Sequence, residues 1–547
     1  MTPDRAEIVG RVLYADGAPA FGAHAIVEDA LRASTAASDG SFRIVDLLPG
    51  DYTLVINQIG FATQRIAVTA KLGEPARVEA VLPVSPIFQA QIDAYRAPPL
   101  EHMGEKAGYL EGLKALPAGD GPNVVLILFD DLGWGDLSCY GNQLIKTPNM
   151  DSLAAEGVRL TQFYAASPVC TPSRAALLTG RFHVRTGADH HVFFSEDSPM
   201  GRYRNALGWG NEIRADEIFL SEVMKARGYA TGMIGKWHLG DRPGVEPNDF
   251  GFDQFYGMRT SHNLRPRDLR RNREIEIPDA EVKLDRLQEQ LTDEAVRFID
   301  DNRANPFFLY LPYTAPHGPH IANPDTAGRS AGGLYGDIIE DLDRQVGRVI
   351  AALDERGLRD NTLVIVTSDN GADMIGDAGP FRGYKIDTYE GGVRVPLLVR
   401  WPGHVPAGAV IEAMATNLDF MPTIARLAGA PLPQDRAIDG ADMMDLLTGA
   451  GGAPQSHLFY FNTWTGRVEA VRDEQYKYRV TTPEAWINPL YPIPFRFEIM
   501  QPRMLTDMLH DRERLDLSVL YPDIVDKLKA VLESQQADLD RNLRGWR

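Results

Sequence analysis

From residue 122 onward, short apolar strands alternate with amphipathic helices. Apolar runs at 124–129, 230–234, 307–311 and 363–367 predict buried strands, and apolar positions between 338 and 353 recur with the period of a helix. Further helices are expected at 150–156, capped by Asn149, and at 221–227. This alternation predicts an α/β fold with a mainly parallel sheet sandwiched by helices. Ligands bind such sheets beyond the carboxyl ends of the strands.

The two ends of the chain follow a different pattern. Residues 8–84 carry short strand-like runs separated by Asp-Gly and Pro-Gly turns, which predicts an N-terminal antiparallel β-sandwich. Runs at 457–461, 468–472 and 476–480, followed by a helix at 524–532, predict a small C-terminal α+β subdomain. We therefore expect a sandwich at 1–84, a loosely packed linker at 85–121, a catalytic domain at 122–450 and the last subdomain at 451–547.

Charge and hydrophobicity narrow the range of partners. The chain has 75 acidic and 56 basic residues and a formal net charge of −19, which disfavours nucleic acid as a partner. The longest apolar run, at 124–129, is far too short to span a membrane, and residues 1–7 lack the basic and apolar regions of a signal peptide. Two cysteines, Cys139 and Cys170, cannot form a disulfide framework, so cysteine usage leaves the compartment open.

Cys170 begins the run Cys-Thr-Pro-Ser-Arg-Ala-Ala-Leu-Leu-Thr-Gly-Arg. Pro172 favours a helix start, which places Cys170 near free N–H groups at the positive end of a helix dipole. That position suits an anion. The alternatives are a buried, inert thiol and an unmodified thiolate nucleophile activated by the helix end.

Polar pairs follow two of the expected strands. Asp130 and Asp131 come directly after the strand at 124–129, and Asp369 and Asn370 come soon after the strand at 363–367. Hard oxygen ligands of this kind suit Ca²⁺ or Mg²⁺ and not zinc. The alternative for one isolated pair is that it caps a helix or a turn.

Basic residues and histidines complete the candidate site. Lys236 and His238 alternate in Gly-Lys-Trp-His-Leu-Gly, so they face one side if the chain is extended. Considered alone, they could equally be a solvated lysine and a buried structural histidine. His317 follows the strand at 307–311. His320 is a candidate for the rim of the pocket, although an ordinary surface histidine is the favoured interpretation. Lys385 precedes Tyr-Glu-Gly-Gly-Val-Arg.

Together these motifs resemble those of type I sulfatases, the arylsulfatase-like, formylglycine-dependent enzymes of the alkaline phosphatase superfamily. Cys-x-Pro-Ser-Arg followed by Leu-Thr-Gly-Arg matches the family signature at every fixed position, and the other motifs follow in family order. The runs Asp-Gly-Ser-Phe at 39–42 and Leu-Pro-Gly-Asp-Tyr at 48–52 resemble the carboxypeptidase regulatory-like domain, an accessory module.

The resemblance implies that a formylglycine-generating enzyme oxidises Cys170 and that the hydrated aldehyde attacks the sulfur of a sulfate monoester. We expect Asp369 to deprotonate the attacking hydroxyl, His317 or Lys385 to assist the leaving alcohol, and His238 to take the proton of the second hydroxyl. Glu390 and Arg394 are expected to be structural partners. The implied catalytic residues are Cys170, Arg174, Lys236, His238, His317 and Lys385, and the implied ligands of Ca²⁺, or of Mg²⁺, are Asp130, Asp131, Cys170, Asp369 and Asn370.

Two other functions remain open at this point. One is a phosphonate monoester or phosphodiester hydrolase with the same nucleophile, and the other is a catalytically dead glycan-binding module. The substrate is expected to be a small-molecule or glycan sulfate ester, and the motifs do not identify which one. We expect the segment 186–217, which contains His190, His191, Phe194 and Trp209, to border the pocket, and 491–497 to reach the same rim. The family resemblance favours a periplasmic or secreted location.

Overall fold

The computed structural model describes residues 5–83, 100–480 and 503–547, apart from 16, 18, 21–22, 31, 38, 58–60, 118–120, 190, 197, 207–209 and 464. The chain divides into two compact units, of which the smaller is built mainly from residues before Pro98. No helix in the described ranges is both long and apolar enough to cross a membrane.

The smaller unit consists of two sheets. One has the order β4 (Ser41–Leu47), β1 (Ala6–Tyr14), β7 (Ala76–Leu82), and the other has the order β3 (Arg32–Thr35), β2 (His24–Val27), β5 (Gly50–Asn57), β6 (Gln64–Ala70). Alternate residues such as Ile44 and Ile56 form one shared core. This is the expected β-sandwich, with one difference: β1 and β7 pair in parallel, whereas only antiparallel pairing was expected.

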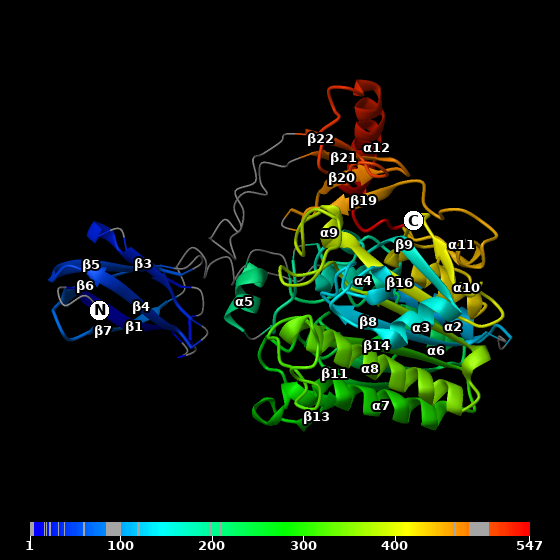
Figure 1. The fold of residues 1–547 in the computed structure, drawn as a ribbon, viewed down its shortest axis with the longest axis horizontal. Coiled ribbons are helices and arrows are strands. Elements are labelled where there is room, and N and C mark those ends of the chain that lie inside the picture. Colours follow the sequence, from blue (N-terminus) through cyan, green and yellow to red (C-terminus); the bar gives the residue numbers. More distant parts are fainter. Residues whose placement is uncertain are drawn as a thin grey trace. The chain divides into compact units, whose positions relative to one another are not determined.

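The larger unit is organised around an eleven-stranded sheet (Figure 1). Its order is β13 (Glu274–Ile277), β12 (Leu269–Arg271), β11 (Gln254–Met258), β10 (Ala230–Lys236), β14 (Phe307–Pro316), β8 (Asn123–Asp130), β15 (Thr362–Ser368), β16 (Arg394–Arg400), β9 (Val158–Tyr164), β17 (Ala409–Ile411), with β18 (Ala415–Thr416) also on β9. The central strands β11, β10, β14, β8 and β15 are parallel, and antiparallel pairs lie on both sides of them. The mainly parallel sheet is therefore confirmed.

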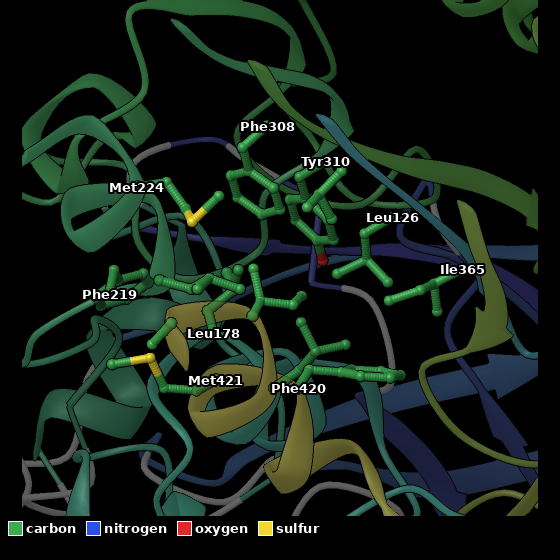
Figure 2. Close-up of a cluster of buried hydrophobic side chains, with 14 of the residues drawn as sticks. Leu126, Leu178, Phe219, Met224, Phe308, Tyr310, Ile365, Phe420 and Met421 are labelled. Atoms are coloured by element: carbon green, nitrogen blue, oxygen red, sulfur yellow. The ribbon is translucent and has the colours of Figure 1, made fainter. Parts of the chain in front are cut away.

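Strand β8 shows how helices cover both faces of this sheet. Leu126 and its alternate neighbours pack with residues of α4 (Cys170–Thr179), α6 (Leu220–Ala226) and α10 (Phe420–Leu427), including Leu178, Met224 and Phe420 (Figure 2). Ile127 and its alternate neighbours pack with residues of α3 (Pro148–Glu156), α7 (Leu287–Asn302) and α8 (Gly333–Glu355). Because the strand is buried on both faces, its sequence is continuously apolar.

Helix α3 begins differently from the expectation. Its first residue is Pro148, whose restricted φ suits that position, so Asn149 lies within the first turn and the expected Asn149 cap is wrong. Asn149 instead bonds Asp343 of α8, with Nδ2 donating to Oδ2 at 2.7 Å, and Asp343 also accepts the N–H of Met150 at 2.8 Å. A carboxylate from another helix satisfies these N–H groups, which local sequence cannot reveal.

The described part of residues 85–121 contains helix α2 (Met103–Lys114). Lys106 is buried there, and its Nζ lies 2.8 Å from Glu222 Oε1 of α6 and donates to the carbonyl of Glu217 at 2.7 Å. The helix is thus anchored by an ion pair and does not pack loosely. Its buried face uses a lysine, which a search for apolar periodicity does not count.

The C-terminal part is an antiparallel sheet, β19 (Leu458–Phe461), β20 (Val468–Arg472), β21 (Tyr476–Val480) and β22 (Arg503–Asp507), packed against α12 (Pro522–Arg541). A buried ion cluster joins it to the large sheet. Lys477 Nζ lies 3.1 Å from Glu390 Oε1 and 2.7 Å from Glu513 Oε1. Arg394 Nη1 lies 3.4 Å from Glu390 Oε2, which agrees with the structural role expected for Glu390 and Arg394. The remaining helices are α5 (Pro199–Ala206), α9 (Glu390–Val393) and α11 (Met444–Thr448).

Candidate active site

The two polar pairs meet at the carboxyl ends of neighbouring strands. Asp130 ends β8 and Asp369 follows β15, and these strands pair in parallel with Phe129 opposite Ser368. The N–H of Asp131 donates to Asp369 Oδ1 at 3.2 Å, and Nδ2 of Asn370 donates to Asp131 Oδ1 at 2.8 Å. The structure therefore brings together four of the five residues predicted to bind the metal, Asp130, Asp131, Asp369 and Asn370.

Cys170 is the first residue of α4, and Arg174 lies one turn later on the same helix. Arg174 Nε donates to Asp369 Oδ2 at 2.9 Å, and its Nη1 donates to the carbonyl of Lys236 at 2.7 Å. The side chains of Arg174 and Asp369 have no solvent exposure. Burial opposes the charge of Arg174, but Asp369, Tyr310 and Asp130 together outweigh burial and raise the pKa of Arg174, so the guanidinium stays charged.

His238 faces position 170 with one defined nitrogen. Its Nδ1 lies 3.4 Å from Cys170 Sγ, and its Nε2 lies 2.9 Å from the carbonyl oxygen of Phe193. Because a carbonyl accepts hydrogen bonds and does not donate them, Nε2 carries the proton and Nδ1 offers a lone pair to position 170. Burial, followed by the charge of Lys236, holds the pKa of His238 well below its usual value, so the ring is neutral.

Two lysines form ion pairs with carboxylates of the site. Lys236 Nζ is 2.6 Å from Asp130 Oδ2, and Lys385 Nζ is 2.8 Å from Asp131 Oδ1. Burial opposes the charge of Lys385, but Asp131, Cys170 and Asp130 together outweigh burial and raise the pKa of this lysine. Both lysines are therefore placed where an anion bound at the strand ends would meet them.

His317 has a single nitrogen available to the site. Its Nδ1 lies 2.6 Å from the carbonyl of Gly318, so this nitrogen donates, and its Nε2 lies 3.7 Å from Asp131 Oδ2. Burial and then Lys385 lower the pKa of His317. His320, expected at the surface, is partly buried beside Tyr335, with ring centroids 5.9 Å apart.

The donor set fits a divalent cation. Oδ1 of Asp130 and Oδ1 of Asn370 are buried and have no hydrogen-bond partner in the described part of the chain. Ligand atoms of Asp130, Cys170 and Asp369 lie within 4.8 Å of one another, as do those of Asp130, Asp131 and His317. Buried carboxylate and amide oxygens without partners are typical of a site for a hard cation.

His262 joins the site without having been singled out in the sequence. It follows β11, is 4% exposed, and its ring centroid lies 5.6 Å from that of His317. Burial, followed by the charge of His317, lowers the pKa of His262 to about 3. The sequence offered one signal, namely its place shortly after the carboxyl end of a strand that neighbours β10.

Part of the segment 186–217 lies against position 170. Val169, Cys170 and Val192 form a small apolar cluster against which Phe194 packs, and Phe193 supplies the carbonyl that orients His238. His190, Trp209 and the segment 491–497 lie outside the described residues.

Three families match the chain. Residues 122–430 match the Sulfatase family, residues 7–83 match the Carboxypeptidase regulatory-like domain, and residues 383–486 match the N-sulphoglucosamine sulphohydrolase C-terminal family.

Named relatives and solved structures agree with these matches. Steryl-sulfatase of Rattus norvegicus is 37% identical, over 66% of this chain and 76% of that protein. Arylsulfatase A of Homo sapiens is 39% identical, over 69% of this chain and 78% of that protein. The structure of Ps i-CgsB in complex with k-i-k-neocarrahexaose has a TM-score of 0.64 and 29% identity, over 78% of this chain and 95% of that chain. The chain therefore belongs to the sulfatase family, carries a carboxypeptidase regulatory-like domain at its N-terminus, and is a sulfuric ester hydrolase.

Proposed function

We propose that this sulfatase cleaves sulfate monoesters at the strand-end site, with position 170, oxidised to formylglycine, as the nucleophile. The observation that carries the proposal is the lone pair of His238 Nδ1, which faces Cys170 Sγ at 3.4 Å. The sulfur occupies the place of an oxygen of the oxidised side chain. An unmodified thiolate is disfavoured, because burial raises the pKa of the Cys170 thiol.

We propose Ca²⁺ as the cation, held by Asp130, Asp131, Asp369 and Asn370 next to position 170. Four protein residues offer oxygen ligands here, and such all-protein cages suit Ca²⁺ better than Mg²⁺, which keeps several of its waters. When bound, the ion draws charge from the nucleophile and from the ester oxygen. Three carboxylates are already balanced by Arg174 and the two lysines, so the bound cation leaves the site positive toward an anionic ester.

The remaining side chains bind the sulfate group and move protons. Lys236 and Lys385 bind sulfate oxygens, and Arg174 holds Asp369 in place. Asp369 takes the proton of the attacking hydroxyl, and His238 Nδ1 takes the second proton, which allows sulfate to leave.

His317 or Lys385 protonates the leaving alcohol, a step worth about 10² to 10⁴ in rate. The lowered pKa of His317 favours its neutral form, whose Nε2 carries no proton, so His317 must take up a proton before it can act as the acid. The raised pKa of Lys385 keeps this lysine protonated before the reaction.

The family matches at residues 7–83 and 122–430 support a division of the chain into functional parts. We propose an accessory sandwich at 1–84, a connecting stretch at 85–121, the catalytic domain at 122–450 and a supporting subdomain at 451–547. Maturation requires a formylglycine-generating enzyme as partner.

Mass spectrometry of the peptide that contains position 170, combined with turnover of 4-nitrophenyl sulfate, tests the proposed function. We expect an aldehyde at position 170 in active enzyme and no turnover by the Cys170→Ala variant. An intact thiol in fully active protein contradicts the mechanism. Faster cleavage of a matched phosphonate monoester than of the sulfate would favour the phosphonate hydrolase instead.

A further inference from the structure

The site opens to solvent on one side. Side chains of Asp130, Arg174, Lys236 and Asp369 have no exposure and Cys170 has 1%, whereas those of His317 and Lys385 are each 13% exposed. A substrate therefore enters past His317 and Lys385. Because the alcohol departs in line, opposite the nucleophile, its body remains at this opening while the sulfate group lies inside.

Four exposed apolar side chains lie on the loops that carry these residues. Ile386, directly after Lys385, is 38% exposed, and Ile321, four residues after His317, is 43% exposed. Met374 and Ile375, on the loop that follows Asn370, are 57% and 55% exposed. Exposed apolar side chains gathered at one place mark a binding surface, in contrast to apolar side chains scattered singly over the surface.

Contacts between the loops bring the segments that carry these side chains close to one another. The N–H of Lys385 donates to the carbonyl of Ala372 at 2.7 Å, which joins the loop of Met374 to that of Ile386. On the other side, a Cβ added at Gly376 would lie 2.7 Å from the hydroxyl of Tyr335, and the Tyr335 ring packs on His320, the neighbour of Ile321.

Ile386 has a backbone conformation that is unfavourable for a β-branched side chain. Its φ is 80°, a region that β-branched residues rarely adopt and that glycine adopts without strain. Its N–H donates at 2.9 Å to the carbonyl of Pro168, two residues before Cys170, and this bond holds the turn. A strained, exposed isoleucine at the mouth of a site points to a role for its side chain.

Acidic side chains on two of these loops accept hydrogen bonds from backbone N–H groups of the same loop. Asp373 Oδ1 accepts the N–H of Met374 at 2.7 Å, and Asp387 Oδ2 accepts the N–H of Tyr384 at 3.0 Å. They stabilise the two loops that carry Met374, Ile375 and Ile386.

We propose that the alcohol part of the substrate is apolar, an aryl or carbocyclic alcohol, and that Ile386 determines this specificity together with Ile321, Met374 and Ile375. This inference rests on the proposed sulfatase site and adds the class of its leaving group.

Two primary alkyl sulfates with six-membered rings test the proposal. Cyclohexylmethyl sulfate and galactose 6-sulfate differ in the polarity of the ring. We expect kcat/KM to be at least about tenfold higher for cyclohexylmethyl sulfate, and Ile386→Gly to lower that value about tenfold with less than about a twofold change for galactose 6-sulfate. The matched control is Ile275→Gly, which removes a 53% exposed isoleucine from the edge strand β13 and should change neither value.

A higher kcat/KM for galactose 6-sulfate in the unaltered enzyme overturns the proposal, and so does an equal loss on both substrates in Ile386→Gly. Thermal unfolding checks that the variant is folded, which is expected because glycine tolerates φ of 80°. Hydrolysis of 4-nitrophenyl sulfate reports separately on the proposed function. If it persists, the sulfatase mechanism stands whichever ring is preferred.

Discussion

The Nδ1 atom of His238 lies 3.4 Å from Cys170 Sγ, while the Nε2–H of the same ring donates to the carbonyl of Phe193. This second bond selects the tautomer, so the nitrogen that faces position 170 can accept a proton. Because burial and Lys236 keep the ring neutral, Nδ1 of His238 keeps its lone pair over the whole physiological pH range.

Replacing His238 with alanine should slow release of sulfate more than release of alcohol. The loss in kcat is expected to be about 10² to 10⁴, the usual contribution of a positioned base. Rapid mixing with 4-nitrophenyl sulfate should then show a burst of nitrophenol equal to the enzyme concentration, followed by slow turnover. Mass spectrometry provides the control, since the aldehyde content at position 170 should not change. A uniformly slow release of nitrophenol without a burst would place His238 in the first step instead.

Removal of the cation should abolish activity and lower the unfolding temperature. Without the ion, Asp130 Oδ1 and Asn370 Oδ1 have no partner in the described part of the chain, and unpaired buried polar atoms are costly. We expect chelation with EGTA to remove turnover and added Ca²⁺ to restore it more fully than Mg²⁺. Asn370→Ala should weaken Ca²⁺ binding measured by calorimetry. Full activity in metal-free protein, verified by elemental analysis, would contradict the assignment.

Much of this site could be predicted from the sequence because its chemistry follows the strands. Asp130 and Asp369 each follow an apolar run, and parallel strands place their carboxyl ends at one edge, so the meeting of the two pairs follows from pattern alone. The α/β alternation could also be predicted, because a strand such as β8 that is buried on both faces appears in the sequence as a continuous apolar run.

Other features depend on contacts that no local pattern records. Lys106 anchors α2 through a buried ion pair with Glu222. Asp343 of α8 accepts a hydrogen bond from the N–H of Met150 in the first turn of α3. His262 packs against His317 from another loop, and Ile386, which has a positive φ, donates its N–H to the carbonyl of Pro168. Each is a tertiary contact between segments distant in sequence, which propensity and periodicity do not encode.

Lys477 should be important for stability and not for catalysis. It lies 1% exposed between Glu390 and Glu513, and its removal leaves both carboxylates short of a partner. We expect Lys477→Met to reduce the free energy of unfolding by about 3–5 kcal/mol, as for other broken buried pairs. Lys529→Met, which removes a half-exposed lysine 3.7 Å from Glu533, should cost less than about 1 kcal/mol. Chemical denaturation measures both, and equal effects would argue against a buried cluster.

Asp136 should make the free energy of unfolding depend on pH. Its buried carboxylate accepts the N–H groups of Gly133 at 2.6 Å and Asp377 at 2.9 Å and the hydroxyl of Tyr335 at 2.7 Å. Burial nevertheless dominates and raises the pKa of Asp136 from 3.8 to about 7. The folded protein therefore binds this proton more tightly than the unfolded chain does.

For this group, stability is greatest below the unfolded pKa of 3.8 and is lost as pH rises toward the folded pKa of about 7. In Asp136→Asn this titration is absent, so the fall in unfolding free energy between about pH 4 and about pH 7 should be shallower than in the unaltered protein. Denaturation at several pH values measures the slope, and Asp360→Asn, at an exposed position, should leave it unchanged. Parallel slopes in Asp136→Asn and the unaltered protein would show that Asp136 is ionised throughout, with its three hydrogen bonds outweighing the cost of burial.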